Sequence, residues 1–280
     1  MKRIFFIFII VVAAYFIYNF SSFFSQSAQN ADVTSKTEEI FIDVGSMNTI
    51  IVPEKRNDVE AKLEGRGKVK VKEERDKISI EYDRPVFQWF QFFSNRKLTI
   101  YIPEDFNREL AIDLGSGNVN LEGPSKNNPF ELEKLSIDMG SGNVNLRNLS
   151  VDEFSHDGSS GNIKIDSLKT KTSTIDISSG SVKIKGFTGE FNGDLSSGNM
   201  EVEMDELTGN VKIDVSSGRV VLDLPDDADF KLRGKTGSGH ISTSFPVEFN
   251  HTDGKSLEGV HGKGEYDIDR SVSSGMIKIE

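Results

Sequence analysis

"DLGSGNVNL" occupies residues 113–121, and "DMGSGNVNL" returns at residues 138–146 with one letter changed. A nonapeptide that recurs within so short a stretch indicates a fold built from stacked repeats. Weaker copies follow, and all of them align on a glycine that is preceded by serine. Those glycines are Gly117, Gly142, Gly161, Gly180, Gly198, Gly218, Gly239 and Gly275. The repeating unit is about twenty residues long, with insertions near residues 122–135 and 246–266.

Each unit has the pattern of short β-strands separated by turns. Apolar and mostly β-branched residues stand two and four positions after the glycines, as Val144 and Leu146 do after Gly142, with Thr243 as the polar exception. This alternation is typical of strands. The pair Gly142-Asn143 joins the two residue types most tolerant of positive φ, so the motif predicts a sharp corner.

Units of this size must stack, because two short strands cannot bury an apolar face alone. Copies about 4.8 Å apart would share a core and place identical residues in ladders, where serine and asparagine side chains can hydrogen-bond. We therefore predict an all-β fold: a single-stranded parallel β-solenoid, similar to a β-helix, with rungs of about twenty residues. The competing architecture is an antiparallel meander in which the motif forms hairpin tips.

The N-terminal segment predicts the compartment. Lys2 and Arg3 precede the apolar run "IFFIFIIVVAAYFIYNF" at residues 4–20. This run is long enough to span a bilayer with slight thinning, so we predict one transmembrane helix with a cytoplasmic N-terminus and an extracytoplasmic C-terminal domain. The alternative is a cleaved signal peptide, with a small-residue site in "SQSA" at residues 25–28.

The chain then divides into three predicted parts. Residues 1–20 form the membrane anchor, residues 21–39 a polar stalk, and residues 40–280 the solenoid. The segment "FIDVGSMNTIIVP" at residues 41–53 looks like a decayed first copy of the repeat. We therefore expect residues 40–110 to be a variant N-terminal part with a cap, and residues 111–280 to be the regular repeats.

Composition excludes several functional classes. The formal net charge is −11, which argues against nucleic acid as a partner. The chain has no cysteine, so disulfides, thiolate metal sites and a cysteine nucleophile are excluded. The four histidines lack metal-ligand spacing, and no nucleophile elbow or phosphate loop precedes a helix. We predict a protein that is not an enzyme and needs no cofactor.

An acidic column is the main chemical feature of the repeats. An aspartate stands four positions before the glycine in six successive copies, and these are Asp113, Asp138, Asp157, Asp176, Asp194 and Asp214. Apolar neighbours on both sides predict that the column lies on the outer face. The favoured interpretation is structural, with carboxylates accepting hydrogen bonds from the turns and with Lys164 and Lys183 nearby. The alternative is weak capture of divalent cations or of a cationic polymer.

One aromatic segment fits no repeat. "VFQWFQFFSNRK" at residues 86–97 holds the single tryptophan and is followed by basic residues. One interpretation is a cap that seals the end of the solenoid. The other is contact with a partner or with the membrane, since aromatic side chains beside basic ones suit a bilayer interface. The candidate contact residues are Phe87, Trp89, Phe90, Phe92 and Phe93.

These motifs resemble a known family. "LTIYIP" at residues 98–103, "AIDLGSGNVNL" at residues 111–121 and "LEGVHGKGEYDIDRSVSSGMIKI" at residues 257–279 are similar to the bacterial β-strand-repeat "putative adhesin" family, whose function is unknown. The layout of one anchor before such a domain is similar to membrane proteins of the Lia cell-envelope stress system of Gram-positive bacteria. The resemblance implies a non-catalytic scaffold or interaction module that meets an envelope protein or polymer; a surface adhesin or glycan-binding protein is the alternative.

Overall fold

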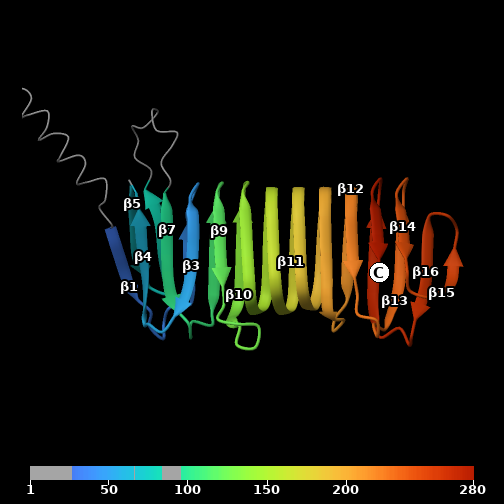
Figure 1. Ribbon diagram of the computed structural model, residues 1–280, viewed down its shortest axis with the longest axis horizontal. Coiled ribbons are helices and arrows are strands. Elements are labelled where there is room, and N and C mark those ends of the chain that lie inside the picture. The colour runs from blue at the N-terminus through green and yellow to red at the C-terminus, as the bar shows by residue number, and fades with distance from the viewer. Residues whose placement is uncertain (1–26, 66, 84–95) are drawn as a thin grey trace, which may run out of the picture.

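The computed structural model describes residues 27–65, 67–83 and 96–280. Over these residues the chain forms one sheet of eighteen strands and no helix, which confirms the predicted all-β class. The sheet coils into an elongated stack whose strands run across its long axis (Figure 1). Among the described residues no helix is long and apolar enough to cross a membrane. The predicted anchor at residues 4–20 lies outside this part of the chain.

The regular repeats form the middle of the stack. Their strands are β8 (Glu109–Leu114), β9 (Asn118–Glu122), β10 (Phe130–Met139), β11 (Asn143–Glu206) and β12 (Val211–Asp223). Strand β11 passes through several corners without a break, and Figure 1 shows it as neighbouring ribbons. Successive rungs pair in parallel with the repeat in register, so that Asp113 lies opposite Asp138 and Asn118 opposite Asn143. The parallel solenoid is confirmed in this part, and the antiparallel meander is wrong for it.

The corner glycines explain why the sequence repeats. Gly161 and Gly180 have φ angles of 136° and 148°, which side chains of L-residues rarely adopt. A Cβ atom on Gly180 would overlap the carbonyl oxygen of Gly161, and a Cβ on Gly161 would overlap that of Gly142. Main chain therefore packs directly on main chain at these corners, and glycine is the residue that allows it.

The predicted polar ladder runs beside these glycines. Asn143 donates from Nδ2 to the side-chain oxygen of Asn118 at 2.7 Å and accepts a bond of 3.0 Å from Asn162. Asn118 in turn donates to Asn48 at 2.7 Å. Each amide thus has a partner in the neighbouring rung, which fixes the register of the stack.

The interior is a continuous column of apolar side chains. Ile112, Ile137 and Ile175 occupy one inward position in different rungs, and each is almost fully buried. All such residues belong to one core cluster that extends through the described part of the stack. Burying one valine, leucine or isoleucine contributes about 1.5–3 kcal/mol, so this core holds the coil together.

The N-terminal end departs from simple stacking. Its strands are β1 (Ser27–Asp32), β2 (Glu39–Asp43), β3 (Asn48–Glu54), β4 (Asp58–Glu64), β5 (Lys68–Glu74), β6 (Lys77–Asp83) and β7 (Lys97–Pro103). Strands β2 and β3 pair in parallel with β8 and β9 as the decayed copy predicts, and β6 and β7 pair in parallel on their other side.

Antiparallel strands close this end. Strand β4 pairs with β7, β5 with β6, and β1 with β4, all antiparallel. Two expectations need correction. The sheet is mixed, because the end strands reverse direction to cover the last parallel rung. The predicted stalk at residues 21–39 contributes a strand, since residues 27–32 pair with β4 along their whole length.

The C-terminal end also departs from simple stacking of parallel rungs. Its strands are β13 (Phe230–Thr236), β14 (His240–Thr243), β15 (Glu248–Thr252), β16 (Ser256–His261), β17 (Tyr266–Val272) and β18 (Met276–Ile279). The last two strands lie between β12 and the rung of β13 and β14, in parallel with both. Strand β16 pairs antiparallel with β13, and β15 with β16. The C-terminus therefore lies inside the stack rather than at its end (Figure 1).

Candidate functional site

The structure assembles the predicted acidic column. Asp138 lies opposite Asp113 on one side and Asp157 on the other, and Asp194 lies opposite Asp214. Asp43 extends the column beyond Asp113. The side chains face outward between buried neighbours, as the alternation predicts.

The column is electrostatically strained. Partial burial, followed by the charges of Asp43 and Asp138, raises the pKa of Asp113. Strands about 4.8 Å apart bring like charges close together, and opposite-sign partners would have to offset them. Lys183, one of the two lysines expected to help, donates from Nζ to a carboxylate oxygen of Glu201 at 2.7 Å. Its help to the aspartate column stays a prediction.

Asp176 lies farther along the same column. Partial burial, then Asp194 and Asp157, raises its pKa in the same way. Within the described residues, no group of three or more histidine, aspartate or glutamate side chains is arranged to hold a metal ion. The proposed cation-binding role therefore stays a prediction.

The aromatic candidates cannot be placed. Phe87, Trp89, Phe90, Phe92 and Phe93 lie in the segment 84–95, outside the described residues. The flanking strands β6 and β7 pair with β2 and β3, whose connection is the corner around Gly45. In sequence, residues 84–95 therefore connect β6 and β7, and these two strands stack on the two strands of the preceding rung, β2 and β3.

His156 is part of the core. Its side chain is 2% exposed, and it stands at the inward position that Ile137 occupies in the preceding rung. Neither ring nitrogen has a hydrogen-bond partner among the described residues. Burial lowers the pKa of His156 to about 4, so the ring is neutral at physiological pH. This position makes His156 a part of the packed interior.

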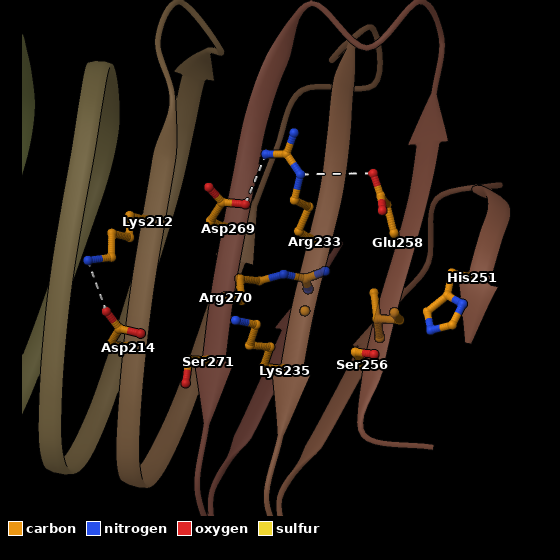
Figure 2. Close-up of a pocket in the computed structure, with 12 residues that line it drawn as sticks. Lys212, Asp214, Arg233, Lys235, His251, Ser256, Glu258, Asp269, Arg270 and Ser271 are labelled. Atoms are coloured by element: carbon orange, nitrogen blue, oxygen red, sulfur yellow. Dashed lines mark hydrogen bonds and ion pairs between the residues drawn. The ribbon is translucent and has the colours of Figure 1, made fainter. Parts of the chain in front are cut away.

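A second candidate site lies at the opposite end of the stack from β1. It is a groove of about 380 Å³ across β12, β17, β13 and the hairpin of β15 and β16 (Figure 2). The groove is lined by Lys212, Asp214, Arg233, Gly234, Lys235, His251, Ser256, Leu257, Glu258, Asp269, Arg270 and Ser271. Positive charges gather here in an otherwise acidic molecule.

Most of the charges on the groove are paired. Arg233 lies 2.9 Å from Asp267 and 3.3 Å from Asp269, and the hydrogen bond to Asp269 is the main reason that its pKa is raised. Lys212 lies 3.4 Å from Asp214. Figure 2 shows Arg233 with Asp269, and Lys212 with Asp214, on the outer side of the strands. These pairs hold the rim in place and leave its net charge small.

Arg270 is different from the other groove residues. It is 3% exposed, between the buried residues Ile268 and Val272 on β17. Among the described residues, no hydrogen-bond partner exists for any of its three side-chain nitrogens. Burial lowers the pKa of Arg270 to about 9, so the group is still charged at neutral pH. The site therefore contains a buried cation without a hydrogen-bonded counter-charge.

The repeat motifs do not point to Arg270, although the sequence carries a signal for it. Counting five positions back from the motif glycine reaches isoleucine in four rungs, His156, Gly193 and Gly234 in three others, and Arg270 in the last one. An arginine is a charged residue at this core position. The signal is easily overlooked, because the repeat is recognised by its glycine and its outer aspartates rather than by this inward column.

The fold and sites define a class of protein. It is a repetitive β-solenoid with a mixed sheet, and antiparallel strands close its ends. The chain belongs to the Toastrack DUF4097 family, whose model matches residues 37–280. The expected resemblance to a β-strand-repeat family is thereby confirmed at the level of the family.

Several solved structures are similar to the chain, and the first of them supports the fold. A "Putative lipid binding protein" from Parabacteroides distasonis ATCC 8503 has 16% identity and a TM-score of 0.51, with 91% of this chain and 97% of that chain covered. A "putative adhesin" from Bacteroides fragilis NCTC 9343 has 13% identity and a TM-score of 0.43, covering 91% and 97%. A "putative adhesin" from Parabacteroides distasonis ATCC 8503 has 13% identity and a TM-score of 0.40, covering 92% and 98%. No curated protein matches the chain.

Proposed function

We propose that this protein is a non-catalytic interaction module of the bacterial cell envelope, held at the membrane by residues 4–20. The observation that carries the proposal is the placement of the two ends. Strand β1, which follows the apolar segment in sequence, lies at one end of the long axis, and strands β13, β15 and β16 lie near the other (Figure 1). Residues of these three strands line the groove. An anchor at the first end would carry the groove away from the bilayer, toward partners in the envelope.

The architecture suits a scaffold. The corner glycines, the asparagine ladder and the continuous core make each rung depend on its neighbours, which gives a stiff body with a long outer surface. The layout of one apolar segment before such a domain is similar to that of LiaG, a membrane-anchored protein of the Lia cell-envelope stress system. This similarity supports a role in the response to envelope stress.

A surface adhesin or glycan-binding protein is the second candidate. The observation that favours it is the groove, which offers a surface for such binding. An adhesin would bind a molecule of another cell or surface, whereas an envelope scaffold would bind a component of its own cell. Crosslinking in intact cells, followed by identification of the captured molecule, separates the two.

The topology can be tested with single cysteines, because the natural chain has none. Asn250 is exposed on β15, near the groove. Asn250→Cys should react with a membrane-impermeant maleimide in intact cells, and Lys2→Cys should react only after permeabilisation. The cysteine-free chain provides the blank. Labelling of Lys2→Cys in intact cells, or a soluble chain that begins near Ala28, would contradict the anchor.

A further inference from the structure

Arg270 opposes the stability of the fold. An isolated charge in an apolar interior is strongly unfavourable, whereas an apolar residue of similar size is often neutral or better at such a position. Ile213 occupies the same inward position in the neighbouring rung. A chain selected for stability alone would carry an apolar residue here as well, so the guanidinium calls for another explanation.

The interior is less closely sealed near Arg270 than in the middle of the stack. Arg270 lies in register with Gly234 on the neighbouring strand. Because Gly234 has no side chain, residues from other strands fill the interior beside it. A Cβ on Gly234 would lie 3.0 Å from Ile241 Cδ1 and 3.0 Å from Leu257 Cγ. Both side chains are only half-buried, whereas Val144, which corresponds to Ile241 in a middle rung, is fully buried.

The groove and the interior meet at this point. Leu257, Gly234 and Arg270 hold the inward positions of their strands, because they alternate with outward-facing residues. The same three residues also line the groove. Figure 2 shows the Arg270 side chain extending from β17 toward β13, between the levels of Arg233 and Lys235. Half-buried Phe245 and Val247 pack against the core as well. Beside the backbone in register with Arg270, the interior is therefore filled by Ile241 and Leu257, which are only half-buried.

We propose that Arg270 binds the acidic group of an amphiphilic carboxylate, whose apolar part packs against Ile241 and Leu257. A planar carboxylate matches the two parallel N–H groups of a guanidinium and would neutralise the buried charge. The acidic residues on the rim disfavour a doubly charged group such as phosphate. The inference rests on the groove end being the ligand-binding end of the proposed function, and it names the chemistry of that ligand.

The test measures the thermal midpoint of the full chain in lipid nanodiscs with three probes. Hexanoate has the acid and an apolar chain, hexanamide lacks the charge, and acetate lacks the chain. Hexanoate at saturation should raise Tm by roughly 2–4 °C, with little effect from the other two. An equal shift with hexanamide, or no shift with hexanoate, overturns the proposal. An equal shift with acetate overturns its amphiphilic part.

Variants assign the effect to the residue. Arg270→Met should raise the Tm of the ligand-free protein and abolish the response to hexanoate. Arg270→Lys keeps the positive charge and should retain a weaker response to hexanoate. This variant keeps the test informative if Arg270→Met does not fold. Arg219→Met, at an exposed cation of β12 outside the groove, is the control and should respond as the natural chain does.

Two results with these variants would overturn the proposal. If Arg270→Met is less stable than the natural chain, the guanidinium stabilises the fold through its neighbours. If Lys235→Met abolishes the response and Arg270→Met does not, the acid binds in the outer groove. The cysteine labelling described above is independent of both results, so a failure of the anchor and a failure of this site can be told apart.

Discussion

A Cβ atom on Gly180 would overlap the main-chain carbonyl oxygen of Gly161, which stands at the same corner one rung earlier. The two glycines belong to a column in which the backbone of each corner rests directly on the one before. Such contact leaves no room for any side chain, whatever its polarity.

Gly180→Ala should therefore destabilise the protein strongly. The new methyl group combines backbone strain at a φ of 148° with steric overlap, and we expect a loss on the order of 3 kcal/mol. Gly254→Ala is the matched control, because Gly254 also has positive φ, at 82°, but a Cβ there would have nothing within 4 Å. Denaturant unfolding measures both. Equal losses at the two positions would show that overlap between rungs contributes nothing.

Asn143→Ala should remove ladder bonds to two neighbouring rungs. Asn143 is both donor to Asn118 and acceptor from Asn162, so its loss should cost about 1–3 kcal/mol. Asn199 occupies the same position after Gly198 and is exposed, without a side-chain hydrogen bond to any described residue. Asn199→Ala should therefore cost clearly less in the same unfolding experiment. A larger loss at Asn199 would contradict the ladder as a stabilising element.

Stability should depend on pH through His156. Its pKa is about 4 in the folded protein and near 6.5 when unfolded, so the unfolded state binds the proton more readily. The contribution of the neutral ring is fully present above pH 6.5 and is lost as the pH falls toward 4. The loss is roughly 3 kcal/mol.

The comparison with His156→Ile isolates this effect. The raised pKa values of Asp113 and Asp176 act in the opposite direction, because protonation of these carboxylates favours the folded state. Both proteins share that contribution, so it cancels in their difference. The difference in unfolding free energy between the two proteins should grow in favour of the variant from pH 6.5 to 4. A difference that does not change with pH would refute the assignment.

Asp176→Asn should be neutral or slightly stabilising at pH 7. The substitution removes one charge from a column of like charges, and the gain should shrink as salt screens the column. Thermal unfolding at low and high ionic strength measures it. Calcium titration of the natural chain is the companion experiment. Heat and stabilisation at millimolar calcium, lost in the variant, would favour the cation-binding interpretation over the structural one.

Trp89 can report on the aromatic segment, since it is the single tryptophan. If the segment caps the solenoid, its emission should be blue-shifted and protected from quenchers without lipid. If it contacts the membrane, the blue shift should appear only when vesicles are added to a chain that lacks residues 1–20. The two outcomes are mutually exclusive, so the spectrum decides between them.

The sequence alone determined the repeating part of the fold. Glycine, asparagine and alternating β-branched residues act through local geometry, and a constant period carries each of them to the same place in every rung. The corner at Gly142, the ladder at Asn143 and the outward position of Asp138 all follow from that period. Membership of the family is carried by the same local motifs, and this is why the residues themselves display it.

Only the tertiary structure decided the order of the rungs and the site at the far end. A period shows that rungs stack, but it does not show that β17 and β18 lie inside β13 and β14, because pairing depends on contacts distant in sequence. For the same reason the groove has no sequence motif. Its residues come from strands β12, β13, β15, β16 and β17, and long-range pairing brings these strands together. The inward position of Arg270 can be read from the sequence, because isoleucine stands at the same place in four other rungs, yet its burial without a hydrogen-bond partner is a property of the packed interior.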